Sequence, residues 1–170
     1  MNIAMETARL VLREIEFEDA PFMHELMNEA PWIEFVGDRG IRTHADARAF
    51  IADRLRPSYA EHGFGFWLTE LQEDGTPLGI CGLIKRDTLD DVDIGFGFCE
   101  RYWGNGYARE SAEAVIDFAR EQACLTRLAA ITHPDNARSS RLLEALGLRF
   151  ERMTRLGDEE RDVRLYIREL

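Results

Sequence analysis

The stretch Arg101-Tyr-Trp-Gly104-Asn-Gly106-Tyr-Ala108 follows an apolar run of alternating residues and opens a segment with helical periodicity. Two glycines two positions apart allow a tight turn and leave no side chain between the backbone amides and a ligand. Amide groups at a helix N-terminus lack intrahelical acceptors, and the helix dipole adds to their preference for an anion. With the charge of Arg101 at its mouth, this glycine turn predicts a pyrophosphate-binding site.

A glycine pair of this kind also occurs in two nucleotide-binding motifs, and neither fits. The dinucleotide fingerprint needs a third glycine at position 109, where this chain has Arg109, inside a regular βαβ unit. The nucleotide P-loop ends in Gly-Lys-Ser/Thr, which is missing here. The function of the glycine turn can therefore be interpreted only together with other motifs of the chain.

Composition indicates an ordinary globular protein. The chain has 170 residues, 45% apolar and 31% charged, which predicts one domain over residues 1–170. A net charge of −11 argues against nucleic acid or an anionic membrane as the main partner. It suits a cationic amine substrate, although surplus surface carboxylates more often serve solubility alone. The segment Met1–Arg13 shows no signal-peptide pattern, and no apolar run has the length of a membrane span.

Apolar periodicity and turn residues place the expected elements. Strands are expected at 8–16, 64–71, 77–86, 91–99, 127–132, 148–156 and 161–168, with turns at Asp74-Gly75, 87–90 and Gly157-Asp158. Helices are expected at 19–28, from a capping box at Thr43 and Asp46 through Leu55, at 104–121, and at 136–146. This order predicts a mixed α+β sheet protein rather than a regular βαβ repeat.

The strand expected at 91–99 has two unlike faces. One face is apolar and predicted to lie in the core: Val92, Ile94, Phe96 and Phe98. The other face is small and acidic: Asp91, Asp93, Gly95, Gly97 and Cys99. Glycines inside a strand often mark the close approach of a backbone or ligand, and a bulge on a solvent face explains them about as well. The adjacent glycine turn favours a ligand cleft.

The helix that starts at Asn136-Ala-Arg-Ser139 adds the second half of the pattern. Asn136 is a favoured N-cap residue whose side chain accepts the N–H of Ser139, and capping alone would explain both residues. Together with the glycine turn, these motifs resemble those of the GCN5-related N-acetyltransferases (the GNAT superfamily), in the branch similar to RimJ/RimL-type amine acetyltransferases. The matching motifs are the Arg-x-x-Gly-x-Gly turn at 101–106, Tyr-Trp-Gly-x-Gly-Tyr-Ala at 102–108, Asn-x-x-Ser at 136–139, Leu-Gly-Leu at 146–148 and the opening strand at 6–13.

The resemblance implies a fold and a cofactor. The fold would be α+β, a twisted mixed sheet of six to seven strands with helices on both faces, whose fourth and fifth strands splay apart. The pantetheine arm of acetyl-CoA, the cosubstrate, would lie in that gap, with Asn136 bonded to it or to the tetrahedral adduct. Arg109 departs from the branch's usual Thr/Ser and would add a cation near the phosphates. The cofactor-binding residues would be Phe98, Cys99, Arg101, Trp103, Gly104, Asn105, Gly106, Tyr107, Ala108, Arg109, Asn136 and Ser139.

Acetyl transfer to nitrogen needs a neutral amine, so a base must take the ammonium proton. Asp93 is the first candidate and Asp91 the second, since two acids on one strand face raise each other's pKa; both also fit a surface turn. Ser139 would protonate the leaving CoA thiolate, with Tyr166 as the alternative donor. Each of these catalytic roles remains a hypothesis at this point.

Other residues and partners carry weaker signals. The histidines have no metal-ligand spacing, so no metal is expected. Three cysteines without a Cys-x-x-Cys pair indicate reduced thiols and a cytoplasmic protein. Residues 32–36 either wall the acceptor pocket or hold their loop in place. The partners expected are acetyl-CoA and an amine acceptor, either a protein N-terminus or a small amine, with a homodimer as the commonest oligomeric alternative. A non-catalytic acyl-CoA-binding protein of the same fold is the competing function.

Overall fold

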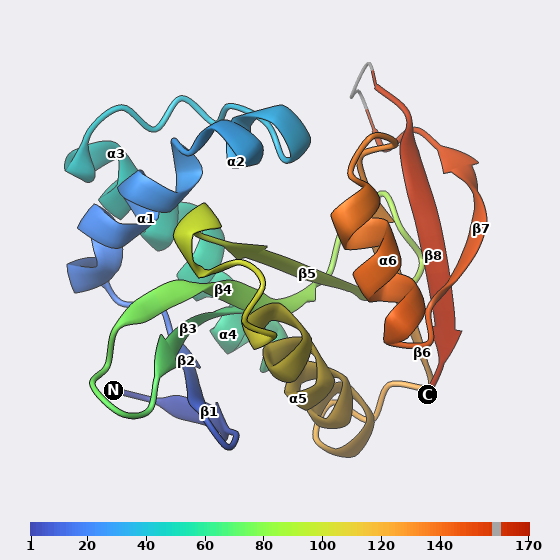
Figure 1. Ribbon diagram of the computed structural model, residues 1–170, viewed down its shortest axis with the longest axis horizontal. Coiled ribbons are helices and arrows are strands. Elements are labelled where there is room, and N and C mark those ends of the chain that lie inside the picture. The colour runs from blue at the N-terminus through green and yellow to red at the C-terminus, as the bar shows by residue number, and fades with distance from the viewer. Residues whose placement is uncertain (158–160) are drawn as a thin grey trace.

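The computed structural model describes residues 1–157 and 161–170, which form an eight-stranded sheet in the order β1-β2-β3-β4-β5-β6-β8-β7 (Figure 1). The strands are β1 (Ile3–Glu6), β2 (Leu10–Glu14), β3 (Phe66–Leu71), β4 (Pro77–Ile84), β5 (Asp93–Phe98), β6 (Arg127–Thr132), β7 (Arg149–Thr154) and β8 (Val163–Glu169). Neighbouring strands are antiparallel except for β5 and β6, which are parallel. The sheet is therefore mixed, as expected.

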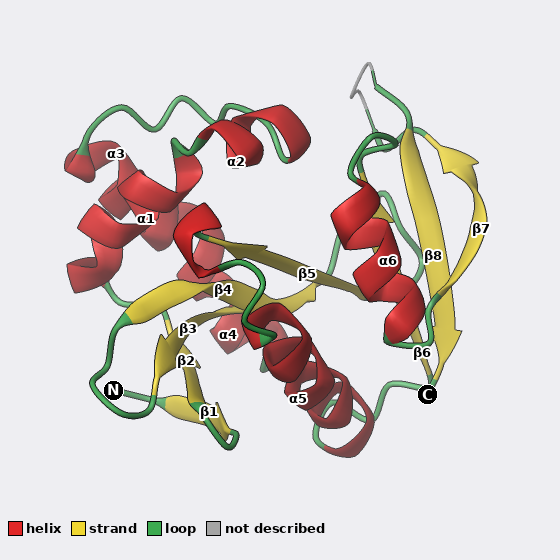
Figure 2. Cartoon of the chain, viewed as in Figure 1, coloured by secondary structure: helices red, strands yellow, loops and turns green. Residues whose placement is uncertain are grey.

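Helices cover both faces of this sheet (Figure 2). They are α1 (Ala20–Met27), α2 (Ala30–Phe35), α3 (His44–Phe50), α4 (Arg56–His62), α5 (Tyr107–Glu121) and α6 (Ala137–Ala145), with short helical turns η1 (Phe17–Asp19), η2 (Ile51–Leu55) and η3 (Glu100–Tyr102). Helix α5 packs on β4 and β5, and α6 packs on β6 and β7, around one core cluster. Helices α1 and α3 pack together over a second cluster on the opposite face.

The sheet opens between β5 and β6. These strands share one residue pair, Asp93 with Ala129, whereas β4 and β5 are paired at six positions. The Ala129 amide donates to the Val92 carbonyl at 2.9 Å, and beyond this point the two strands diverge. Figure 1 shows β5 running away from the half of the sheet that contains β6, β8 and β7. The splayed fourth and fifth strands of the sequence prediction are these two strands.

The sheet has eight strands rather than the expected six to seven. The additional strand is β1, four residues at the sheet edge that pair with β2 across a turn closed by the Thr7 amide and the Leu10 carbonyl. Helices α2 and α4 were also not expected, since six or seven residues with an early proline carry too little periodicity.

Local signals were more dependable than element ends. The capping box at Thr43 and Asp46 is present, with both reciprocal hydrogen bonds at 2.9–3.0 Å. Strand β6 has the predicted bounds, and Gly147, with φ +82°, ends α6. Of the turn expected at Gly157-Asp158, Asp158 lies outside the described residues. In the described part of the chain, no helix combines the length and apolarity needed to cross a membrane.

Candidate active site

The glycine turn joins β5 to α5 and is held by its own side chains. Gly104 and Gly106 have φ values of +79° and +81°, a region that favours glycine, and Gly106 is the N-cap of α5. Asn105 donates to the Tyr102 carbonyl at 2.9 Å, and Arg9 donates to the Asn105 carbonyl at 3.0 Å. Among the described residues, the backbone amides of residues 104–109 find no protein acceptor. The turn thus presents unpaired donors at the start of a fifteen-residue helix, as an anion site requires.

The positive charge at this turn does not come from Arg101. Its guanidinium bonds Glu25 of α1 at 2.5 Å and stacks on the Tyr102 ring, so it points away from the turn. Arg109 lines the hollow at the turn, although its Nε also forms an ion pair with Glu113 at 2.9 Å. Arg138, which lies 4.3 Å from the centre of the Trp103 ring, also lines it. Glu25 and, at 3.7 Å, Glu29 attract the Arg101 side chain, and the cofactor contact expected of Arg101 stays a prediction.

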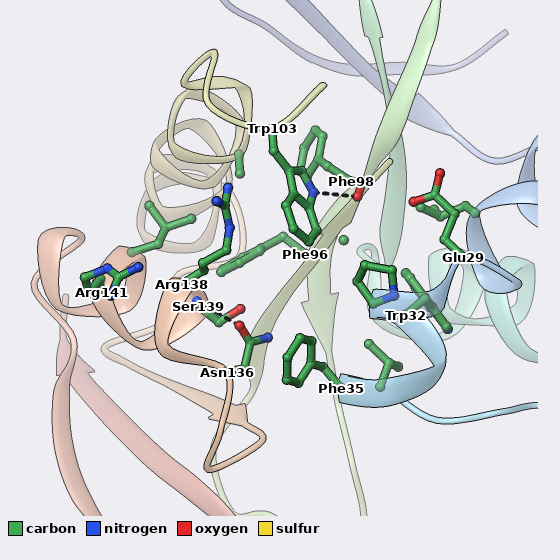
Figure 3. A pocket seen from close by; sticks show the side chains of 16 residues that line it. Glu29, Trp32, Phe35, Phe96, Phe98, Trp103, Asn136, Arg138, Ser139 and Arg141 are labelled. Carbon is green, nitrogen blue, oxygen red and sulfur yellow. Dashed lines mark hydrogen bonds between the residues drawn. The ribbon is translucent and has the colours of Figure 1, made fainter. Parts of the chain in front are cut away.

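A cavity of about 360 Å³ runs from the turn along the end of β5 (Figure 3). We call it the Trp103 cavity, because the Trp103 indole stands over it and donates to the Phe98 carbonyl at 2.9 Å. Figure 3 shows Asn136, Arg138 and Ser139 on one side and Trp32 and Phe35 on the other. The predicted cap is present: Asn136 Oδ1 accepts the Ser139 N–H at 3.2 Å.

A second cavity of about 180 Å³ lies between the N-terminal helices and the sheet, and we call it the Asp93 cavity. Asp93 lines it with only 1% of its surface exposed, and Arg86 Nε bonds its Oδ1 at 3.0 Å. Burial raises the pKa of Asp93 to about 6, although Arg86 acts in the opposite direction. The sequence argument had attributed such a rise to Asp91, but Asp91 forms an ion pair with Arg127 at 3.3 Å and lines neither cavity. Burial, not a second acid, perturbs this carboxyl.

The two cavities meet at a common wall. The residues that line both are Trp32, Phe35, Val36, Phe96 and Ser139. Of these, Ser139 is the only hydroxyl, and it belongs to the helix start that faces the divergence of β5 and β6. The two cavities are therefore neighbours, with Ser139 in the wall between them.

Two of the expected site residues lie elsewhere. Tyr166 is 1% exposed in the core that α5 and α6 cover, edge-on to the Phe150 ring, and lines neither cavity. Cys99 is fully buried in the opposite core cluster, and burial raises the pKa of its thiol to about 12. Both side chains occupy core positions, and any contact of Cys99 with a cofactor would have to use its backbone.

The glycines of β5 make room for aromatic side chains. A Cβ on Gly97 would lie 2.4 Å from Trp32, and one on Gly95 would lie 3.0 Å from Phe66. The close approach that the sequence indicated is therefore made by rings of the protein itself. These rings line the cavities. The small-residue face of β5 therefore shapes the site by letting aromatic rings pack against it.

Several cavity residues were missed in the sequence. Arg138 lies inside the Asn-x-x-Ser motif, where a cation at a helix start next to a phosphate turn was a usable signal. Arg39, Arg86 and Arg161 line the Asp93 cavity and come from three separate loops, so no local pattern marks them. Only the fold brings these three together.

Unpaired amides at a helix start, next to a parallel strand pair that splays apart, form the architecture of a CoA-dependent acyltransferase. Residues 9–149 match the family described as "Acetyltransferase (GNAT) domain", and the chain belongs to this family. It is similar to the uncharacterized protein YkkB of Bacillus subtilis, at 32% identity over 88% of this chain and 87% of that protein. It is also similar to the uncharacterized N-acetyltransferase YnaD of the same organism, at 28% identity over 85% and 82%.

Among solved structures, the fold is similar to that of RimL, a ribosomal L7/L12 alpha-N-protein acetyltransferase in complex with coenzyme A. The TM-score is 0.83, with 17% identity over 99% of this chain and 98% of that one. The expected GNAT fold is confirmed, and its likeness to the RimL structure is one of fold. As a member of this family the protein is an acyltransferase with acetyl-CoA as its cosubstrate. The unpaired amides, Arg109, Arg138 and the Trp103 cavity fit that cosubstrate.

Proposed function

We propose that the protein transfers the acetyl group of acetyl-CoA to a primary amine by direct attack of the amine. The observation that carries this proposal is a buried carboxyl, Asp93, in a cavity that meets the Trp103 cavity beside Ser139. The Trp103 cavity would receive the cosubstrate, and the Asp93 cavity would receive the acceptor. A buried carboxyl whose pKa is raised to about 6 and that lines a cavity next to the cosubstrate is suited to act as a general base.

Acetyl-CoA supplies a thioester whose carbonyl carbon a neutral amine can attack, with the CoA thiolate as leaving group. The amides of residues 104–109, with Arg109 and Arg138, would bind the phosphates. Asn136 and the end of β5 would align the pantetheine arm, since both line the Trp103 cavity. These residues fix the reacting carbon near the common wall of the two cavities.

Asp93 would take the amine proton, directly or through a water molecule. With a pKa of about 6 it is ionised at neutral pH and still a stronger base than an ordinary carboxylate. Arg86 binds Oδ1 and holds the group in place. An N–C bond forms as the C–S bond breaks, and the proton on nitrogen passes to Asp93.

Ser139 would donate a proton to the thiolate and regain one from solvent, because among the described residues it alone offers a hydroxyl to both cavities. Tyr166 could do so only if the core around it opened, so we assign the donor role to Ser139. The thiol-release assay below tests whether the acceptor is a protein N-terminus or a small amine.

The test is release of CoA thiol from acetyl-CoA in the presence of N-terminal peptides, polyamines and aminoglycosides, one class at a time. Acceptor-dependent release that falls about hundredfold in kcat in Asp93→Asn supports the proposal. Asp91→Asn is the matched control, an acid two positions away that lines neither cavity. Binding of acetyl-CoA with no thiol release from any amine would favour the non-catalytic CoA-binding protein. Equal rates in Asp93→Asn would remove Asp93 from the mechanism.

A further inference from the structure

The charge of the Asp93 cavity is opposite to that of the whole protein. Among the described residues, its ionisable side chains are three guanidinium groups, one imidazole and one carboxyl: Arg39, Arg86, Arg161, His133 and Asp93. The chain as a whole carries a net charge of −11. Arg86 is neutralised by its ion pair with Asp93, so the described residues leave an excess of positive charge in a cavity for an amine. A plain cationic amine would be repelled there.

The other two arginines lie where the loop after α2 meets the start of β8. Asp38, the acid next to Arg39, bonds both guanidinium nitrogens of Arg42 at 2.9 and 2.5 Å and has a pKa lowered to about 2, mainly by that bond. Asp38 is therefore engaged elsewhere and does not neutralise Arg39. Arg161 Nη2 donates to the Val36 carbonyl at 2.6 Å, which ties β8 to the end of α2 and sets its guanidinium on the cavity wall.

His133 adds a further donor. Its Nδ1 accepts the Asp135 amide at 3.1 Å, so the neutral ring carries its proton on Nε2. The ring also packs edge-on against Phe35, which fixes its place in the wall. The donors of this cavity suit an acceptor atom of the ligand that carries negative charge.

The volume limits the ligand. A cavity of about 180 Å³ is smaller than the roughly 300–1,000 Å³ of most small-molecule pockets. An amine and an anionic group that both occupy it must therefore be only a few bonds apart. An amino acid backbone, or a short acidic side chain with its own α-amine, meets this limit.

We propose that the acceptor is a primary amine that carries a carboxylate a few bonds away, as a free amino acid or an acidic N-terminal residue does. Its nitrogen faces Asp93, and its carboxylate binds Arg39 and Arg161. This inference rests on the proposed acetyl transfer, because it assigns the second cavity to the acceptor. Transfer onto such an amine consumes acetyl-CoA and yields an N-acetylated acid and CoA.

The experiment compares matched acceptors that differ only in the anionic group. One arm uses free amino acids against their α-amides, and the other uses peptides that begin with Asp or Glu against Asn or Gln, so that the two arms separate the sources. We expect kcat/KM to be about tenfold or more higher for the acid of at least one pair, mostly through KM. Arg39→Gln and Arg161→Gln should each remove most of this preference for the acid over its amide.

Arg54→Gln is the matched control, since Arg54 is an exposed arginine that lines neither cavity, and it should preserve the preference. Preference for amides or polyamines, unaltered by the arginine variants, would overturn the acceptor class while acetyl transfer itself stands. If no amine releases thiol, calorimetry of the same pairs on the CoA-loaded protein decides. Binding of the acid but not the amide, lost in Arg39→Gln, supports the inference, and equal or absent binding refutes it.

Discussion

Replacing Asp93 by Asn should remove the pH-dependent contribution that the buried carboxyl makes to the free energy of unfolding. A pKa raised from 3.8 to about 6 means that ionising this group costs about 3 kcal/mol more in the folded than in the unfolded chain. Between these two pKa values the folded state binds more protons than the unfolded state, so the stability that Asp93 contributes falls as pH rises. It is fully present below about pH 4 and lost above about pH 6.

The assay is urea unfolding of the wild type and Asp93→Asn at several pH values from 4 to 8. Other titrating groups are common to both proteins, so the difference in unfolding free energy reports Asp93. We expect Asp93→Asn to gain about 2.5 kcal/mol relative to the wild type between pH 4 and 8. The Asn variant also leaves Arg86 unpaired, which shifts the whole difference by a constant and does not alter its slope. A difference that stays flat with pH would refute the argument that burial perturbs this carboxyl.

Three further variants test the remaining parts of the site. Gly106→Val introduces a β-branched residue at φ +81° with a Cβ position 3.4 Å from Arg9 Nη2, and should raise the Kd of acetyl-CoA about tenfold or more, as calorimetry can show; unchanged affinity would exclude the turn as the phosphate site. Ser139→Ala should lower kcat about hundredfold with the acetyl-CoA Kd preserved, and a full kcat would assign the thiolate proton to another donor. Gly97→Ala puts a methyl group 2.4 Å from Trp32 and should raise the acceptor KM, whereas an unchanged KM would separate that ring from the acceptor wall.

Elements with dense local information could be predicted from the sequence. Strand β6, from Arg127 to Thr132, is a short apolar run followed by the loop residues His133-Pro134-Asp135, and its predicted bounds were correct. The cap at Asn136 likewise follows from its own side chain and the Ser139 amide. Helix α2 was missed because its six residues include Pro31 and depend on tertiary packing, above all Trp32 on Gly97. A helix this short is not stable in isolation, so its sequence carries no clear helical pattern.

The parts of the site that depend on backbone conformation could be predicted from the sequence. The parts that depend on burial in the folded protein could not. The glycine turn needs only residues that permit positive φ, and both glycines adopt it. The prediction placed Asp93 correctly on strand β5, but its raised pKa comes from burial in the folded protein, which the spacing of residues along the sequence does not encode. Arg101 shows the opposite case, where an attractive local position is overridden by Glu25 from α1.

Net charge is a poor guide to the acceptor, because the fold decides which charged side chains line the cavity. The sequence carries 32 acidic and 21 basic residues, which on its own suits a cationic substrate. Yet Arg39, Arg86 and Arg161 line the Asp93 cavity. Arg39 is exposed, but Arg86 and Arg161 are partly buried, which gives their charges more weight than the same charges on an open surface. Exposed carboxylates are screened within about 8 Å at physiological salt, so they do not reverse the field inside the cavity. The groups that line the cavity therefore outweigh the sum over the chain in selecting the acceptor.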